Sequence, residues 1–214
     1  MRIAHLPLIL ILAFFGILTQ ALAPAHAGTV PTEKFHNGDL IFQQSKSRQS
    51  AAILEATGSP WSHVGMLVQK GKDWYVAEAV QPVRITQLQS FIDRGRDKSY
   101  RVYRIRGITD NEVTALEDAI APQLGKNYDI FFEWSDDTLY CSELIYKAVF
   151  VATGKEIGNV QRFADLNLNG PLIQELIRQR YKNTGTTFNP NEPIVTPVSQ
   201  LEDSDLDLVV RVGK

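Results

Sequence analysis

The fold is indicated most clearly by the stretch Ser62-His63-Val64-Gly65-Met66-Leu67-Val68-Gln69, which is followed after four residues by Trp74-Tyr75-Val76-Ala77-Glu78-Ala79-Val80. Both runs are rich in Val, Leu, Met and aromatic residues, and the residues between them are Lys-Gly-Lys-Asp. Two such runs joined by a short polar segment with glycine are typical of a β-hairpin. We predict a register in which Gln69 faces Trp74.

This register brings a histidine and a carboxylate together. His63 would lie opposite Val80, with Glu78 as its diagonal neighbour about 7 to 8 Å away on the same face of the sheet. Alanines flank Glu78 on both sides, and a carboxylate in such surroundings usually has a partner. We therefore predict that Glu78 hydrogen-bonds to His63, although a lone histidine is more often structural. Gly65 falls on the same face, and we expect it to leave space there for another element or a substrate.

The only cysteine of the chain lies in the segment Tyr140-Cys141-Ser142-Glu143-Leu144-Ile145-Tyr146, where a helix is predicted to begin. A helix N-terminus and a nearby imidazolium both lower a thiol pKa, and the N–H groups there can face the oxyanion of a tetrahedral intermediate. The alternative is a small buried apolar residue, the commoner fate of free cysteines. Together, the three residues favour Cys141 as nucleophile, His63 as base and Glu78 as the group that orients the base.

The rest of the chain alternates between strand and helix patterns, as judged from apolar spacing, capping signals and turn residues. Further strands are predicted at residues 39–43, 83–85, 100–105 and 206–212, helices at 47–57, 88–92, 109–125, 141–154 and 170–181, and a proline-containing loop at 183–197. This order predicts an α+β fold, a mostly antiparallel sheet packed with helices.

Several of these segments resemble a known family. The segment Gly38-Asp39-Leu40-Ile41-Phe42, followed by Ser62-His63-Val64-Gly65-Met66, is similar to the paired motifs "GDLIF" and "HVGIY" of the NlpC-type papain-like cysteine peptidases. Gly125-Lys126-Asn127-Tyr128-Asp129 and Tyr140-Cys141-Ser142-Glu143-Leu144 look like the tyrosine segment and cysteine helix of that family, but they come after the pair. The order His, Glu, Cys resembles the circularly permuted branch, and most of all its YiiX-like amidases. The likeness covers about residues 37–153, and it is weaker at 194–197.

The resemblance implies a papain-like fold with Cys141, His63 and Glu78 as catalytic residues. It also implies that Tyr128 lies near the nucleophile, with its hydroxyl contacting substrate or oxyanion; a core aromatic residue is the alternative. Two features depart from peptidoglycan-cutting relatives. No cell-wall-binding repeat is recognisable, and Ser142-Glu143 replaces the usual Ser-Gly, which is expected to make the first helical turn bulkier and more acidic.

Composition and the first residues bear on location and partners. Residues 1–27 combine Arg2, an apolar run and Ala25-His26-Ala27, the pattern of a secretory signal, so we predict a single hydrolase domain at 28–214 that is periplasmic or secreted. An uncleaved membrane anchor is the alternative. The formal net charge is −2 and no basic stripe is present, which argues against nucleic-acid partners. Because no HExxH or CxxC motif is present, we predict no metal and no cofactor.

The sequence thus predicts an exported thiol hydrolase that cleaves an amide bond of a small peptide or an acyl-amino acid through an acyl-enzyme. A lipid-directed amidase, thioesterase or acyltransferase would use the same residues. In that case the segment 130–134, Ile-Phe-Phe-Glu-Trp, would line an acyl pocket; otherwise it belongs to the core. A non-catalytic periplasmic binding module that retains the fold is a third interpretation. The sequence does not indicate the oligomeric state.

Overall fold

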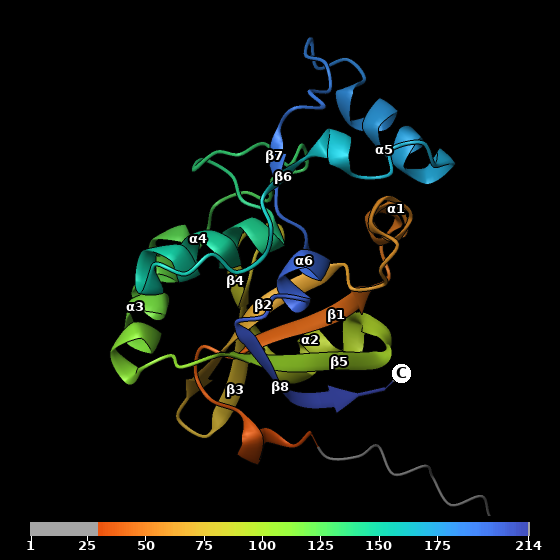
Figure 1. Cartoon of the computed structure of the whole chain (residues 1–214). Helices are drawn as coiled ribbons and strands as arrows, with labels where there is room; N and C mark the ends of the chain where they lie inside the picture. The colour runs from red at the N-terminus through yellow and green to blue at the C-terminus, as the bar shows by residue number, and fades with distance from the viewer. Residues whose placement is uncertain (1–29, 214) are drawn as a thin grey trace, which may run out of the picture. The chain divides into compact units, whose positions relative to one another are not determined.

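The computed structural model describes residues 30–213, so the predicted signal segment lies outside the described residues. Contacts group Pro31–Lys214 as one compact unit. At its centre is a six-stranded sheet in the order β4-β3-β2-β1-β5-β8, in which every neighbouring pair is antiparallel (Figure 1). The strands are β1 (Leu40–Ser45), β2 (His63–Lys70), β3 (Asp73–Glu78), β4 (Arg84–Gln87), β5 (Gly95–Ile105) and β8 (Leu206–Val212). The predicted α+β class, with a mostly antiparallel sheet, is confirmed.

Five helices follow the predicted pattern, one of them shorter than expected, and a sixth, α6, was not predicted. They are α1 (Arg48–Thr57), α2 (Leu88–Arg94), α3 (Asp110–Ile120), α4 (Cys141–Thr153), α5 (Pro171–Tyr181) and α6 (Pro197–Leu201), with 3₁₀ turns at Thr32–Lys34, Ala121–Gln123 and Phe163–Asp165. Helix α3 begins with the predicted capping box, in which Thr109 and Glu112 bond each other's backbone N–H. It ends at Ile120 and not near Gly125, because Pro122 cannot continue the i→i−4 ladder.

The hairpin register is the one predicted. Gln69 pairs with Trp74 and Lys70 with Asp73, so that β2 and β3 run together up to Met66 and Ala77. On its other edge β2 pairs with β1, where Gln43 faces His63. His63 and Glu78 therefore lie at the ends of β2 and β3 that are far from the turn.

The segment predicted as a loop at 183–197 contains short regular elements. Strand β7 (Pro193–Ile194) pairs with β6 (Gln161–Arg162), and α6 begins immediately after it. Thr196 caps α6 by accepting from the Ser199 N–H at 3.2 Å, and Pro197 occupies the first helical position. Proline is favoured there because its missing N–H would have no intrahelical partner. Of the prolines that indicated a loop, Pro197 therefore marks the start of a helix and Pro193 begins β7.

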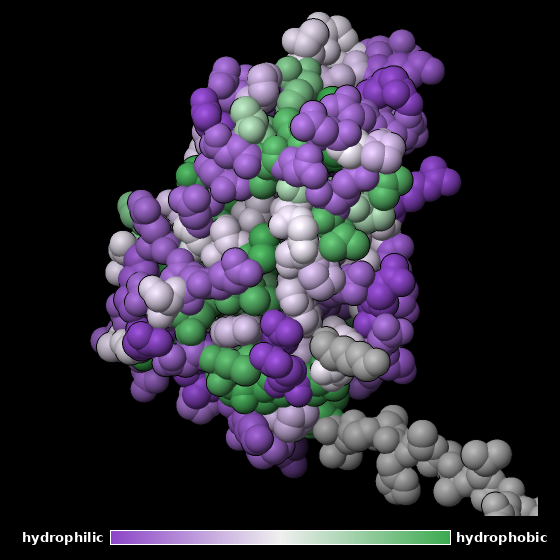
Figure 2. All heavy atoms as spheres, turned by 45° about the vertical axis from the view of Figure 1, so that its right-hand side comes forward, coloured by the Kyte–Doolittle hydropathy of each residue, from purple (hydrophilic) through white to green (hydrophobic). Residues whose placement is uncertain are grey.

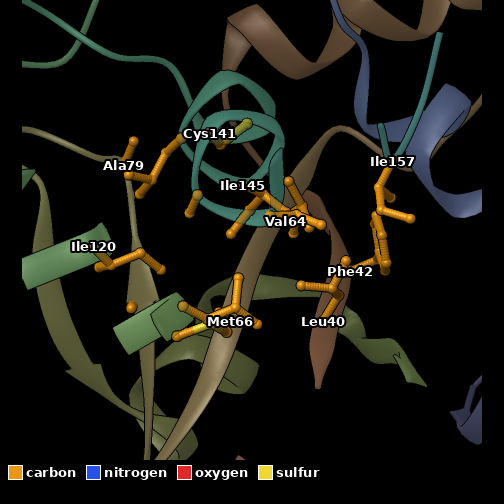
Figure 3. Close-up of a cluster of buried hydrophobic side chains, with 14 of the residues drawn as sticks. Leu40, Phe42, Val64, Met66, Ala79, Ile120, Cys141, Ile145 and Ile157 are labelled. Atoms are coloured by element: carbon orange, nitrogen blue, oxygen red, sulfur yellow. The ribbon is translucent and has the colours of Figure 1, made fainter. Parts of the chain in front are cut away.

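Helix α4 packs against β2 on one face of the sheet. Its Leu144 and Ile145 contact a cluster of buried side chains that includes Phe42, Val64 and Met66 (Figure 3). Each of these side chains is at most 1% exposed, and burial of one such side chain stabilises the fold by about 1.5 to 3 kcal/mol. The packing fixes the first turn of α4 above the start of β2.

Two smaller clusters lie beside this core. One contains Phe132, Tyr140, Tyr146, Phe163, Ile194 and Val195, and the other joins α1 to α5 through Ala52, Ala56 and Ile173. Figure 1 shows α5 and the β6–β7 pair on the same side of the sheet as α1. Segments from both halves of the chain thus border the first turn of α4.

The surface is largely hydrophilic, with apolar side chains in separate patches on the face drawn in Figure 2. The larger exposed apolar side chains include Phe150 and Val151 of α4. Within residues 30–213, every helix is too short or too polar to cross a bilayer.

Candidate active site

The three residues predicted to carry the chemistry come together at the ends of three elements. His63 is the first residue of β2, Glu78 the last of β3 and Cys141 the first of α4. They are 7%, 0% and 3% exposed, respectively. Figure 3 shows Cys141 in the first turn of α4, at the edge of the apolar cluster on β2. The site therefore lies where the hairpin and the helix are fixed by core packing.

The imidazole of His63 is held from several sides. Its Nε2 lies 2.6 Å from Oε2 of Glu78, and the ring packs against Phe91 at 5.7 Å between centroids. Thr86 donates to Oε1 of Glu78 at 2.6 Å, and the Arg94 guanidinium donates to Oε2. Since Glu78 occupies Nε2, the nitrogen left for Cys141 is Nδ1.

The charges of the site reinforce one another. Burial raises the pKa of Glu78, but the hydrogen bond and charge of His63, with Arg94 and Thr86, outweigh it and lower that pKa to about 2. Burial lowers the pKa of His63, while the charge and hydrogen bonds of Cys141 and Glu78 raise it to about 9. The arrangement therefore favours a carboxylate beside an imidazolium.

The thiol of Cys141 completes this charge distribution. Burial raises its pKa, but the charge of His63, a hydrogen bond to it and the N–H groups of Val64 and Ser142 lower the pKa below its ordinary value. A thiolate is the nucleophilic form of cysteine. The surroundings of Cys141 thus favour a thiolate–imidazolium pair with His63.

Gly65 does not leave the open space that we expected. A Cβ at this position would lie 2.4 Å from Cγ1 of Val76, 2.9 Å from the Ala77 carbonyl oxygen and 3.3 Å from Cβ of Glu78. Strand β3 fills the space instead. The glycine therefore permits the close approach of β3 that carries Glu78 to His63.

Tyr128 lies beside Cys141, in the loop before α4. A backbone bridge pairs it with Leu139, and its hydroxyl oxygen accepts a hydrogen bond from Nε2 of Gln49 at 2.7 Å. Burial and the charge of Cys141 raise the pKa of Tyr128 well above its ordinary value, so the phenol keeps its proton at neutral pH. The side chain also packs against Phe132, so Tyr128 is both part of the apolar wall and a polar group of the site.

A small cavity opens beside Cys141. Its volume is about 40 Å³, and its walls are mainly apolar side chains of α1, α5 and the loops around α4: Ile53, Ala56, Thr57, Tyr128, Phe132, Tyr140, Ser142, Phe163, Leu166, Ile173, Leu176, Ile194, Val195, Thr196 and Pro197. From the segment 130–134 only Phe132 reaches this cavity, and Phe132 also belongs to a buried cluster. Ile130 is 47% exposed.

The C-terminal segment holds the first turn of α4 in place. Ser142 donates from Oγ to the Val195 carbonyl oxygen at 2.9 Å, and Gln200 donates to the Ser142 carbonyl oxygen at 2.9 Å. The Val195 N–H in turn donates to the hydroxyl of Tyr140 at 3.2 Å. Val195 and Gln200 thus hold the residues on both sides of Cys141.

Glu143, the acidic residue of the first turn of α4, is directed away from the cavity beside Cys141. It is 0% exposed, and its Oε1 lies 2.8 Å from Nζ of Lys147, one turn further along α4. Burial raises the pKa of Glu143 to about 7 despite the lysine. The side chain is directed into the protein and does not line the cavity beside Cys141.

Sequence reasoning did not identify several residues that support the site: Thr86 and Arg94 at Glu78, Gln49 at Tyr128, Arg180 at Gln49, and Gln200 at Ser142. His36, the other histidine among residues 30–213, is exposed. These supporting polar residues lie in helices and strands whose sequence patterns are otherwise ordinary. No local signal distinguishes them.

Three comparisons with known proteins agree with this geometry. The model of the permuted papain-like amidase family, YaeF/YiiX, C92, matches residues 34–210. The uncharacterized protein YiiX of Escherichia coli (strain K12) is 38% identical over 175 residues, which cover 81% of this chain and 85% of YiiX. A crystal structure described as metalloprotein yiiX from Escherichia coli O157:H7 superimposes with a TM-score of 0.79 and 37% identity, over 84% of this chain and 98% of that one. The chain therefore belongs to the permuted papain-like amidase family.

Proposed function

We propose that this protein hydrolyses an amide bond, with Cys141 as nucleophile, His63 as proton carrier and Glu78 as the group that orients His63. The observation that carries the proposal is the buried 2.6 Å contact between Nε2 of His63 and Oε2 of Glu78. It leaves Nδ1 to face a cysteine whose pKa is lowered at the first turn of a helix.

The proposed reaction has two halves. The Cys141 thiolate forms an Sγ–C bond with the carbonyl carbon, and the oxyanion accepts from the Cys141 N–H and the Tyr128 hydroxyl. The imidazolium of His63 gives its proton to the leaving amine as the C–N bond breaks, which leaves a thioester. Water then attacks the thioester while His63 takes its proton. Release of the acid restores the thiolate and the imidazolium.

The substrates we propose are small peptides or acyl-amino acids, met after export to the periplasm or the medium. Two features support this choice. Residues 1–27 carry the pattern of a secretory signal, and the walls beside Cys141 have no basic stripe that would suit nucleic acid.

An acyl-enzyme trap tests the proposal. We expect p-nitrophenyl acetate to transfer its acetyl group to Cys141, with a burst of one p-nitrophenolate per protein and the mass increase of one acetyl group on the intact chain. Cys141→Ala should show neither the burst nor the adduct. A wild-type protein whose cysteine reacts only after denaturation would contradict the proposed function and favour a binding module.

A second candidate keeps the same residues and changes the acyl group to that of a lipid. The mainly apolar walls of the cavity beside Cys141 favour it. Its volume of about 40 Å³, however, is far below the roughly 300 to 1,000 Å³ of typical small-molecule pockets. A long acyl chain would thus require the cavity walls to move.

A series of acyl chain lengths separates the two candidates. We expect the acylation rate constant of wild type to be at least about tenfold higher with p-nitrophenyl acetate than with the decanoate ester. Leu176→Ala, which enlarges the cavity, should raise the decanoate rate relative to acetate. Leu172→Ala, on an exposed position of the same helix, is the control. A preference of wild type for decanoate would support the lipid-directed candidate.

The residues of the site do not fit a metal centre, although the related crystal structure is described as a metalloprotein. Among residues 30–213, no three His, Cys, Asp or Glu side chains lie so that they could hold an ion. Both oxygens of Glu78 already accept from Thr86, His63 or Arg94, and the Arg94 cation disfavours a second one there. We therefore assign no step to a metal.

A further inference from the structure

We propose that Gln49 and Arg180 are positioning residues that make the Tyr128 hydroxyl a hydrogen-bond donor toward the reacting carbonyl oxygen. The proposal rests on the proposed function and extends it. It gives the C-terminal half of the chain, through α5, a part in the reaction.

A short chain of hydrogen bonds connects the three side chains. Arg180, near the end of α5, donates from a guanidinium nitrogen to Oε1 of Gln49 at 2.5 Å. Gln49, in the first turn of α1, donates from Nε2 to the hydroxyl oxygen of Tyr128 at 2.7 Å. Tyr128 lines the cavity that also contains Cys141.

The direction of these bonds follows from the donors and acceptors. A guanidinium has only donors, so the amide of Gln49 must turn its oxygen to Arg180 and its NH₂ to Tyr128. The hydroxyl oxygen of Tyr128 then serves as acceptor, and its single hydrogen is not used on Gln49. That hydrogen is left to point to an acceptor on the other side, where a substrate carbonyl bound at Cys141 would lie.

Arg180 is itself held in place. Its guanidinium lies over the ring of Phe132, 4.7 Å from the centroid, and none of the ion pairs found among residues 30–213 involves it. Packing of Ala52 and Ala56 against Ile173 fixes α1 against α5. The hydrogen bond from Arg180 to Gln49 thus serves to orient the amide of Gln49.

The substitution Gln49→Glu reverses the last bond of the chain without changing its shape. A carboxylate would still accept a hydrogen bond from Arg180, but it would also accept a hydrogen bond from the Tyr128 hydroxyl. The hydroxyl hydrogen would then no longer be available to the substrate carbonyl. Loss of one oxyanion donor commonly costs a factor of 10² to 10³ in rate. We expect Gln49→Glu to slow acylation by p-nitrophenyl acetate by about 10²-fold, with an unchanged rate of iodoacetamide alkylation, which requires the thiolate but no oxyanion donor.

Tyr128→Phe provides the second test. It should slow acylation as much as Gln49→Glu does, and adding Gln49→Glu or Arg180→Met to it should cause less than a twofold further loss. The control is Gln179→Glu, which adds the same charge at an exposed neighbour of Arg180 and should leave both rates unchanged.

The outcomes separate this proposal from the proposed function. If wild type is acylated and Gln49→Glu reacts as fast as wild type, the hydrogen-bond chain only ties α1 to α5. Additive losses in the double variants would also show a structural tie. A wild-type protein that the ester does not acylate at all would overturn the proposed function, and this inference with it.

Discussion

His63→Ala is expected to lower the rate constant for acylation of Cys141 by about 10²- to 10⁴-fold, the range associated with loss of a general acid–base. Two effects combine. The leaving group loses its proton donor, and Cys141 loses the cation and hydrogen bond that lower its pKa, so burial alone then acts on the thiol. Stopped-flow release of p-nitroaniline from an acetyl-amino-acid p-nitroanilide, whose amine leaving group needs a proton, measures the first effect at neutral pH.

Alkylation measures the second effect separately. In wild type, the iodoacetamide rate should reach half its maximum below the ordinary thiol pKa of about 8.5, and in His63→Ala at or above that value. His36→Ala is a matched control, since His36 is an exposed loop histidine and the other histidine of the described chain. A His63→Ala variant that keeps the wild-type alkylation profile would show that His63 does not act on the thiol.

The pairing of His63 with Glu78 could be predicted because the relevant constraints are local. A four-residue polar segment between two apolar runs limits the hairpin register, and the register determines which side chains become neighbours. The start of α4 at Cys141 was predictable for a similar reason, since the apolar stripe from Leu144 to Ala152 has helical spacing.

The supporting contacts depend on how distant elements pack, and the sequence does not specify this. Arg94 reaches Glu78 only because α2 folds back beside the end of β3. Gln49 and Arg180 are 131 residues apart, and they meet only because α1 packs on α5. The wrong expectation at Gly65 has the same origin. The periodicity of a strand or helix gives the direction in which a side chain points. It does not tell which other element fills the space in that direction.

Glu78→Gln should have an effect of similar size on acylation, about 10²- to 10⁴-fold, because the orienting carboxylate of a comparable histidine contributes on that scale. The amide keeps the shape of the side chain but not its charge. Loss of that charge lowers the pKa of His63, which is about 9 in wild type. The upper limit of the pH–rate profile should therefore move from near pH 9 toward the ordinary histidine value of 6.5.

The pH profile distinguishes this role from simple structural support. A variant that only loosens the fold would lower the rate equally at all pH values, whereas loss of an orienting charge also moves the alkaline limit. Glu33→Gln, an isosteric change at an exposed position, should alter neither the rate nor the profile. An unchanged alkaline limit in Glu78→Gln would contradict the assigned role of Glu78.

The same substitution has a consequence for stability whose sign follows from the two shifts. The pKa of Glu78 falls from 4.5 to about 2 on folding, so its contribution is present above pH 4.5 and is lost as the pH falls toward 2. The pKa of His63 rises from 6.5 to about 9, so its contribution is full below pH 6.5 and is lost as the pH rises through 9. Both are present only between about pH 4.5 and 6.5. The free energy of unfolding, measured by urea denaturation, should differ most between wild type and Glu78→Gln in that window, by on the order of 3 kcal/mol. A difference that stays constant from pH 3 to pH 9 would mean that the buried pair is not ionised in the folded protein.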